Sequence, residues 1–264
     1  MDTNQPMNNE SQSEEKIVDA AVVLIGDEVL SGRTQDLNLN HIAKTLGEIG
    51  IQIGEARVIP DIPQRIIDTV NELRARHNYV FTTGGIGPTH DDITADCIAK
   101  AFGVGIGPHP EALRRLEAHY KGSGIEFNEA RHRMTRIPDG ARLIDNPVSA
   151  APGFVIGNVH VMAGIPKIMQ AMLEGVLPTL EGGDKVHSLT ITGEVPEGTV
   201  ANRMEQLQAE NSGVTLGLYP YYSAGKAGVS VVARGTDMAQ LERVAALISE
   251  HIQAVGGAIV QRPT

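Results

Sequence analysis

Cysteine, tryptophan and long apolar runs are the features that the sequence has least of. The single cysteine among 264 residues, Cys97, excludes an intramolecular disulfide, and no cysteine and histidine pairs have the spacing of a zinc site. The longest apolar stretches, such as residues 20–25, are far shorter than the roughly 20 residues that span a bilayer. We therefore expect no membrane anchor, and a soluble protein of the cytoplasm.

Positive charge and aromatic rings are also scarce. The formal net charge is -10, and aromatic residues make up 3% of the chain. Proteins that bind nucleic acids usually gather Lys and Arg on one face and often stack bases on aromatic rings. We therefore expect no nucleic-acid partner.

The first 16 residues differ in composition from the rest of the chain. They are polar and acidic, and they lack the cationic start and apolar run of a secretory signal. So few apolar groups cannot offset the entropy of ordering the chain. Residues 1–16 are expected to form a disordered tail.

A regular alternation of strand and helix patterns follows the tail. Residues 17–25 are apolar and rich in Val, as expected for a strand covered on both faces. The pattern continues with a loop at residues 26–35, a helix at 36–50, a strand at 52–59, a helix at 63–76 and a strand at 79–82. This order predicts a three-layer, doubly wound α/β fold with a mostly parallel sheet, in which ligands bind at the carboxyl ends of the strands.

The remainder of the chain predicts the end of this domain and a second, smaller one. Helices are expected at residues 92–102, 110–121, 126–135 and 166–180, with two short strands within 154–163. Residues 181–185 look like a linker, and the later pattern β-α-β-β-α-β suggests a ferredoxin-like α+β module. The predicted domains are residues 17–181 and 186–264.

The densest signal for function is the segment TTGGIGPTHDDIT at residues 82–94. Glycine lets backbone amides approach a ligand closely, and the helix that follows offers free N–H groups to an anion. The expected phosphate-binding residues are Thr83, Gly84, Gly85, Gly87, Pro88 and Thr89. The segment matches neither the lysine-containing phosphate loop nor the dinucleotide fingerprint. The alternative is a tight turn whose glycines serve geometry alone and whose Asp91 or Asp92 caps the helix.

Two carboxylates follow this phosphate-binding segment directly. A carboxylate repels a phosphate unless a cation lies between them, and Mg²⁺ is commonly held by one or two carboxylates together with water and phosphate oxygens. The predicted metal ligands are Asp91 and Asp92 with Asp27, for Mg²⁺, Mn²⁺ or Co²⁺.

A second polar segment, GDEVLSGRTQDLN at residues 26–38, follows the first strand. Its position at a strand end of the same sheet favours a place beside the ligand. The candidate ligand-binding residues are Gly26, Asp27, Glu28, Ser31, Gly32 and Asp36. The alternative is a polar surface loop in which Asp36 caps the next helix.

Four motifs in order resemble the MoaB/Mog-like molybdopterin-binding domain family. They are GDEVLSG at residues 26–32, TTGGIGPTHDD at 82–92, PGF at 152–154 and AGIPKIM at 163–169. The chain is most similar to the amino-terminal part of the competence/damage-inducible protein A (CinA) family, over about residues 17–180. The segment after Lys185 fits that family's small additional domain.

The resemblance carries expectations about the site and the assembly. It implies that the glycine loop holds phosphates, that Asp61 and Asp92 act on the bound molecule, and that Gly164 and Pro166 contact the ligand. A homo-oligomer is also expected, since relatives commonly form one. Longer members of the family carry an amidohydrolase domain and eukaryotic relatives an FAD synthase domain, and neither is expected in this sequence.

Three functions follow from these features. The leading hypothesis is a metal-dependent pyrophosphatase that cleaves a nucleotide such as ADP-ribose or FAD. The alternatives are molybdopterin binding or adenylylation in molybdenum-cofactor biosynthesis, and a sensor that binds nucleotide without turnover. In each case the partner is a small nucleotide or pterin ligand.

Overall fold

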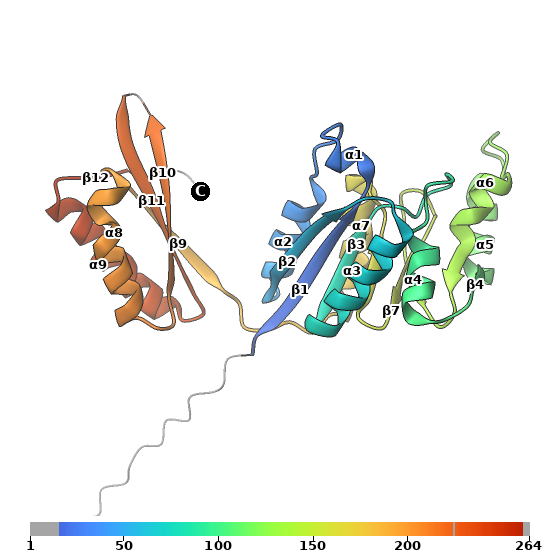
Figure 1. The fold of residues 1–264 in the computed structure, drawn as a ribbon, viewed down its shortest axis with the longest axis horizontal. Coiled ribbons are helices and arrows are strands. Elements are labelled where there is room, and N and C mark those ends of the chain that lie inside the picture. The colour runs from blue at the N-terminus through green and yellow to red at the C-terminus, as the bar shows by residue number, and fades with distance from the viewer. Residues whose placement is uncertain (1–15, 224, 261–264) are drawn as a thin grey trace, which may run out of the picture. The chain divides into compact units, whose positions relative to one another are not determined.

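The computed structural model describes residues 16–223 and 225–260, which form two compact units (Figure 1). The first unit ends at Asp184 and the second begins at Lys185. All but Lys16 of the expected tail at residues 1–16 lies outside the described residues.

The first unit is built on a six-stranded sheet in the order β2-β1-β3-β8-β7-β6. Neighbours among β2, β1, β3 and β8 are parallel, whereas β7 and β6 each run antiparallel to their neighbour. The predicted doubly wound, mostly parallel sheet is therefore confirmed. The strands are β1 (Val18–Ile25), β2 (Ile51–Ile59), β3 (Tyr79–Thr83), β6 (Arg142–Ile144), β7 (Gly153–Ile156) and β8 (Val159–Met162).

Helices cover both faces of this sheet, as Figure 1 shows, because β1 is apolar on both of its faces. Ala21 and Val23 pack in the core cluster of α3 and α4, whereas Val22 and Leu24 pack in that of α2 and α7. The helices of the unit are α1 (Asp27–Leu30), α2 (Asn38–Gly47), α3 (Pro63–Arg76), α4 (Thr94–Phe102), α5 (Pro110–Tyr120), α6 (Glu129–His132) and α7 (Pro166–Val176).

Several predicted boundaries are wrong for local reasons. The loop expected at residues 26–35 contains the one-turn helix α1. The helix expected at 126–135 is only α6 followed by a 3₁₀ turn, Arg133–Thr135, because the Asn128 side chain accepts the Arg131 N–H and starts the helix late. The helix expected at 166–180 ends at Val176, and the next turn contains Pro178, which has no N–H to donate.

A small two-stranded sheet also escaped prediction. It pairs β4 (Ile106–Pro108) with β5 (Arg136–Pro138). Strands of three residues carry too little alternation to be recognised in a sequence. With β5 paired in this way, the chain after the 3₁₀ turn is held against β4 beside α4 and α5.

The second unit has the predicted order β-α-β-β-α-β. Its antiparallel sheet has the order β10-β11-β9-β12, which confirms a ferredoxin-like module. The apolar faces of both helices pack on this sheet in a core of their own. The elements are β9 (His187–Glu194), α8 (Glu197–Glu210), β10 (Thr215–Ser223), β11 (Lys226–Gly235), α9 (Met238–Ala254) and β12 (Ala258–Ile259).

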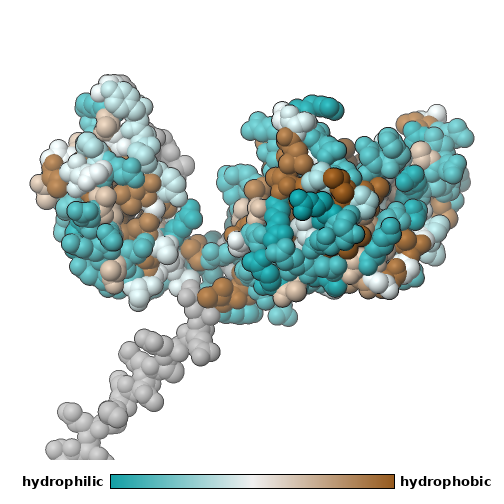
Figure 2. All heavy atoms as spheres, viewed as in Figure 1, coloured by the Kyte–Doolittle hydropathy of each residue, from teal (hydrophilic) through white to brown (hydrophobic). Residues whose placement is uncertain are grey.

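The surface is mainly hydrophilic on the face shown in Figure 2, with hydrophobic atoms in small groups on each unit. Within residues 16–223 and 225–260, no helix combines the length and hydropathy needed to cross a membrane.

The segment that joins the units is fastened to the first unit. The amide of Lys16 donates to the Asp184 carboxylate at 2.8 Å, and the amide of Asp184 donates to the Lys16 carbonyl at 3.0 Å. The Glu181 amide donates to the Tyr79 hydroxyl at 2.9 Å. At Gly182 a Cβ atom would clash with the backbone of Ile49, so the approach of the two segments requires glycine.

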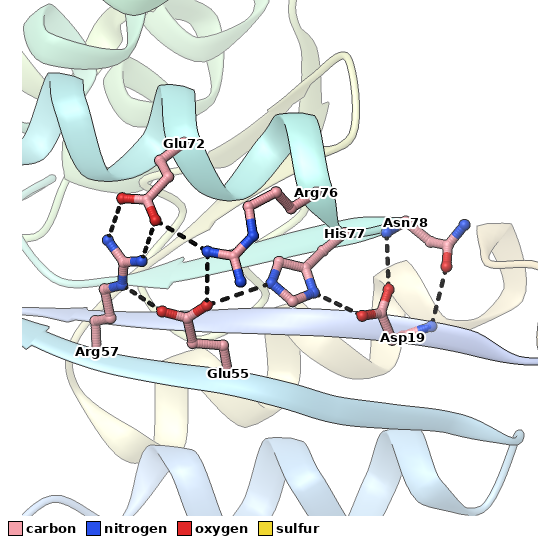
Figure 3. A network of polar contacts seen from close by, with 7 residues as sticks. All are labelled: Asp19, Glu55, Arg57, Glu72, Arg76, His77 and Asn78. Carbon is pink, nitrogen blue, oxygen red and sulfur yellow. Dashed lines mark hydrogen bonds and ion pairs between the residues drawn. The ribbon is translucent and has the colours of Figure 1, made fainter.

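A polar network ties α3 to the sheet (Figure 3). The Arg57 guanidinium donates to both carboxylate oxygens of Glu72, at 2.7 and 2.6 Å, and to Glu55 at 2.6 Å. The ring of His77, at the end of α3, is largely buried and lies 2.6 Å from the Asp19 carboxylate of β1. The network therefore joins α3 to both β1 and β2.

This network predicts a pH dependence of stability. The hydrogen bond from Arg57 lowers the pKa of Glu72 from 4.5 to about 2. A carboxyl whose folded pKa lies below its unfolded pKa stabilises the fold above the unfolded value, and this contribution disappears as the pH falls through the folded value. We expect Glu72→Gln to lower the unfolding free energy at pH 6 and to flatten its decline between pH 4.5 and 2.

Urea unfolding across this pH range measures the effect. Glu117→Gln is the control, since the Glu117 side chain on α5 has no ion pair within the described ranges. An identical pH profile for the Glu72 variant and the wild type would show that the ion pair does not stabilise the fold.

Candidate functional site

Four loops meet at one edge of the large sheet. Because β1, β2, β3 and β8 are parallel, the loops that follow them leave from the same edge. Two hydrogen bonds join neighbouring loops to strands, from the Gly26 amide to the Ile59 carbonyl and from the Gly84 amide to the Met162 carbonyl, both at 3.1 Å. The two predicted ligand segments are thus placed side by side.

The glycines of the loop after β3 allow this close approach. Gly84 has a φ of 102°, and a Cβ atom there would clash with the carbonyl oxygen of Ile25 at the end of β1. A Cβ on Gly164, after β8, would lie 3.2 Å from the Cα of Gly84. Loops from three strands therefore touch through their backbones at this point.

Asp92 shapes the loop from within. Its Oδ2 atom accepts a hydrogen bond from the Thr89 amide at 2.7 Å and another from the Thr89 hydroxyl at 2.5 Å. Helix α4 begins only at Thr94, with Ile93 at the N-cap position and no side-chain cap. Asp92 therefore closes the turn at Thr89 and does not cap α4, and the helix expected from residue 92 starts two residues later.

A cavity of about 560 Å³ opens beside this loop. Its size suits a nucleotide-sized ligand rather than a single phosphate. The predicted site residues that line it are Glu28, Gly84, Gly85, Gly87, Pro88, Asp92, Gly164 and Pro166.

The remaining predicted residues lie around the cavity. Asp36 and Thr83 line a hollow of about 50 Å³ that shares Glu28, Gly164 and Pro166 with the cavity. Asp36 also accepts the amides of Asn38 and Leu39, as the capping alternative predicted. Thr89 lines an open groove of about 390 Å³. The residues that line none of these spaces are Gly26, Asp27, Ser31, Gly32, Asp61 and Asp91.

Asp61 lies near other carboxylates on the loops beside the cavity. Its Oδ2 atom accepts the Asp27 amide at 3.1 Å, which joins the loops after β1 and β2. Burial raises the pKa of the Asp61 carboxyl, and the charges of Asp27, Glu28 and Asp91 raise it further, against the lowering effect of that hydrogen bond. A carboxylate with a raised pKa is a stronger base than an ordinary aspartate.

A divalent cation at this cluster would have few protein ligands among the described residues. Across residues 16–223 and 225–260, no group of three His, Cys, Asp or Glu side chains could hold a metal ion. Mg²⁺ does not need such a cage, because it commonly takes one or two carboxylates and fills its other positions with water and phosphate oxygens. Burial is the main cause of the raised pKa of Asp61, and the smaller contribution from neighbouring carboxylates is the kind that a cation relieves.

Sequence reasoning missed the opposite wall of the cavity. It is formed by residues without a motif of their own, Tyr120, Met134, Asn146 and Ser149. The nearest signal was the PGF motif at residues 152–154, which adjoins the lining residue Ala151.

The loop that carries Asn146 is held in a strained conformation. The Asn146 amide group donates to the Ser149 hydroxyl at 2.7 Å and to the Ala151 carbonyl at 2.8 Å. Ala150 between them has a φ of 63°, and it has no side chain that could stabilise this conformation. Such strain is commonly found at ligand sites.

Residues 21–182 match the family model described as probable molybdopterin binding domain. The chain belongs to this family. The matched residues include every cavity-lining residue named above, so the whole candidate site lies within the molybdopterin-binding domain. A second family model, described as FAD synthase, middle domain, matches residues 185–258.

Relatives of this molybdopterin-binding-domain protein include CinA-like proteins. A protein of Aeropyrum pernix is 33% identical over 91% of this chain and 96% of its own length. A CinA-like protein of Citrifermentans bemidjiense is 38% identical over 74% of this chain and 49% of its own length, so the chain spans about half of that relative.

A solved structure supports the same relationship. It is described as the protein CinA with unknown function from Thermoplasma acidophilum, and it is 32% identical with a TM-score of 0.57. The similarity covers 61% of this chain and 96% of that one. The resemblance to the CinA family expected from the four motifs is therefore confirmed.

Proposed function

We propose that the protein is a metal-dependent pyrophosphatase that cleaves a nucleotide pyrophosphate of the ADP-ribose or FAD type. The observation that carries the proposal is that a glycine loop, suited to a phosphate, and Asp92 line a nucleotide-sized cavity, while the hydrogen-bonded pair of Asp27 and Asp61 lies on the neighbouring loops after β1 and β2. The match of residues 185–258 to an FAD synthase middle domain adds support for a nucleotide ligand.

The residues divide between binding and reaction. Backbone amides of residues 85–87 bind the spectator phosphate and stabilise the negative charge that develops in the transition state, since the Gly84 and Thr89 amides already donate within the protein. Asp61 orients the attacking water and accepts its proton, a role that its raised pKa favours. The ring of Tyr120 and the side chains of Ile165 and Ile168 provide an apolar surface for the base.

The proposed reaction requires a divalent ion. Asp92, with Asp91 or Asp27, would hold it. When bound, the ion supplies charge neutralisation at the pyrophosphate and lowers the pKa of bound water. The Oδ1 atom of Asp92 is available for this purpose, since both hydrogen bonds from Thr89 go to Oδ2.

The test is turnover of ADP-ribose, FAD, NAD and ATP by the purified chain with Mg²⁺, Mn²⁺ or Co²⁺. We expect AMP to be released from at least one dinucleotide-like compound, and EDTA to abolish the release. Absence of turnover with every compound and metal would refute the proposed activity.

A second candidate function is molybdopterin binding or adenylylation in molybdenum-cofactor biosynthesis. The description of the matching family model favours it. It predicts that the chain binds molybdopterin and, if it is an adenylyltransferase, joins it to AMP from ATP with release of pyrophosphate. Binding of molybdopterin without turnover of ADP-ribose or FAD would favour this function over the first.

A further inference from the structure

Two spaces besides the main cavity adjoin the glycine loop, and Arg133 lines both. One is the open groove of about 390 Å³, lined by Pro88, Thr89, His90, Glu129, Ala130 and Arg133. The other is a hollow of about 20 Å³ whose lining includes Gly87, Asp92 and Arg133. Pro88 also lines the main cavity, so the groove and the cavity adjoin at this residue.

The guanidinium of Arg133 is available to a ligand. Its side chain is exposed, and the described part of the chain provides it with no hydrogen bond or ion pair. The arginines on either side of it are engaged. Arg131 donates to the Glu126 carbonyl and lies over the Tyr120 ring, whereas Arg136 donates twice to Asp96.

A cationic side chain would offset the negative charge of the site and of a bound phosphate. The glycine loop lacks the lysine that reaches the phosphates in common phosphate loops, and the carboxylates of Asp61, Asp91 and Asp92 lie near it. A guanidinium binds a phosphate through two parallel hydrogen bonds, which combine charge with a fixed geometry.

We propose that the groove is a second phosphate subsite in which Arg133 binds one phosphate of a ligand whose other phosphate lies on the glycine loop. The ligand class is therefore a nucleotide with two linked phosphates. The inference rests on the proposed function only for this linkage, and it requires no turnover. Glu129 also faces the groove and opposes an anion there, so the two side chains should have opposite effects on binding.

Calorimetric titration of the full chain with AMP, ADP and inorganic pyrophosphate, all with Mg²⁺, tests the subsite. We expect Arg133→Gln to weaken the binding of ADP and pyrophosphate about tenfold, as for the loss of a charged hydrogen-bonded pair. The affinity for AMP should change less than about twofold. We expect Glu129→Gln to tighten the binding of ADP and pyrophosphate about twofold to threefold.

Arg114→Gln is the matched control, because Arg114 is 71% exposed, pairs with Glu111 and lines none of these spaces. Thermal melting checks that each variant is folded. The inference would be overturned if Arg133→Gln weakened the binding of AMP and ADP equally, or left the binding of ADP unchanged. It would also be overturned if the wild type bound none of the three compounds.

The outcome is separable from that of the proposed activity. Selective loss of ADP and pyrophosphate binding without any turnover of ADP-ribose would support the subsite and refute the hydrolase. Turnover of ADP-ribose together with ADP binding that does not depend on Arg133 would support the hydrolase and refute the subsite.

Discussion

An Asp92→Asn variant is expected to lose metal-dependent turnover of its nucleotide pyrophosphate by about 100-fold or more, a loss typical of a missing catalytic group. The amide keeps an oxygen that can accept both hydrogen bonds from Thr89, so the loop retains its shape. What disappears is the negative charge that would hold the divalent ion. Steady-state kinetics at saturating Mg²⁺ measure the effect.

Asp91→Asn tests which second carboxylate holds the ion together with Asp92. Asp91 adjoins Asp92 and undergoes the same chemical change, but it is exposed and lines none of the cavities described above. A metal ion held by Asp92 with Asp27 predicts a small effect at Asp91, whereas a pair of Asp91 and Asp92 predicts comparable losses. Full activity of Asp92→Asn would show that Asp92 serves only to shape the loop.

Replacing Gly84 with alanine is expected to destabilise the first unit by about 4 kcal/mol or more, at the upper end of single substitutions. The residue has a φ of 102°, and the new Cβ would clash with the Ile25 carbonyl, which belongs to the buried end of β1. Neither strand can retreat without losing its place in the sheet. Native-state hydrogen exchange of amides in β1 and β3 reports the free energy of unfolding of this unit.

Gly32→Ala separates the two causes of this loss. Gly32 also has a positive φ, 72°, but nothing lies within 4 Å of the Cβ position. Its substitution is expected to cost only the backbone strain, about 1–2 kcal/mol. Equal losses in the two variants would show that the contact between Gly84 and Ile25 contributes nothing beyond backbone conformation.

The success of sequence reasoning differed between the centre of the sheet and its periphery. The boundaries of α3 were predicted correctly because Pro63 marks its first turn and Ile66, Val70 and Leu73 form one buried face. The prediction for residues 126–138 was wrong because a helix cap, a 3₁₀ turn and a short strand follow one another in this segment. None of these has the length over which periodicity becomes visible.

The candidate site was predictable on one side only. The glycines at positions 84, 85 and 87 predict an unusual backbone conformation, and the parallel sheet places them beside the loop at Gly26. Tyr120, Asn146 and Ser149 belong to segments whose residue types are ordinary for a surface, so only the folded chain brings them to the cavity. The hydrogen bond between Asp61 and Asp27 was likewise invisible, since it joins loops 34 residues apart.

The fastening of the linker determines how the protein can be divided. Residues 181–184 are distant in sequence from the start of β1, yet they close the fold beside Lys16. A fragment cut before Glu181 would expose the Tyr79 hydroxyl and the backbone of Ile49, whereas one that spans residues 16–184 keeps these partners. A fragment designed to contain the first unit should therefore include residues 181–184, although the sequence pattern predicts a linker there.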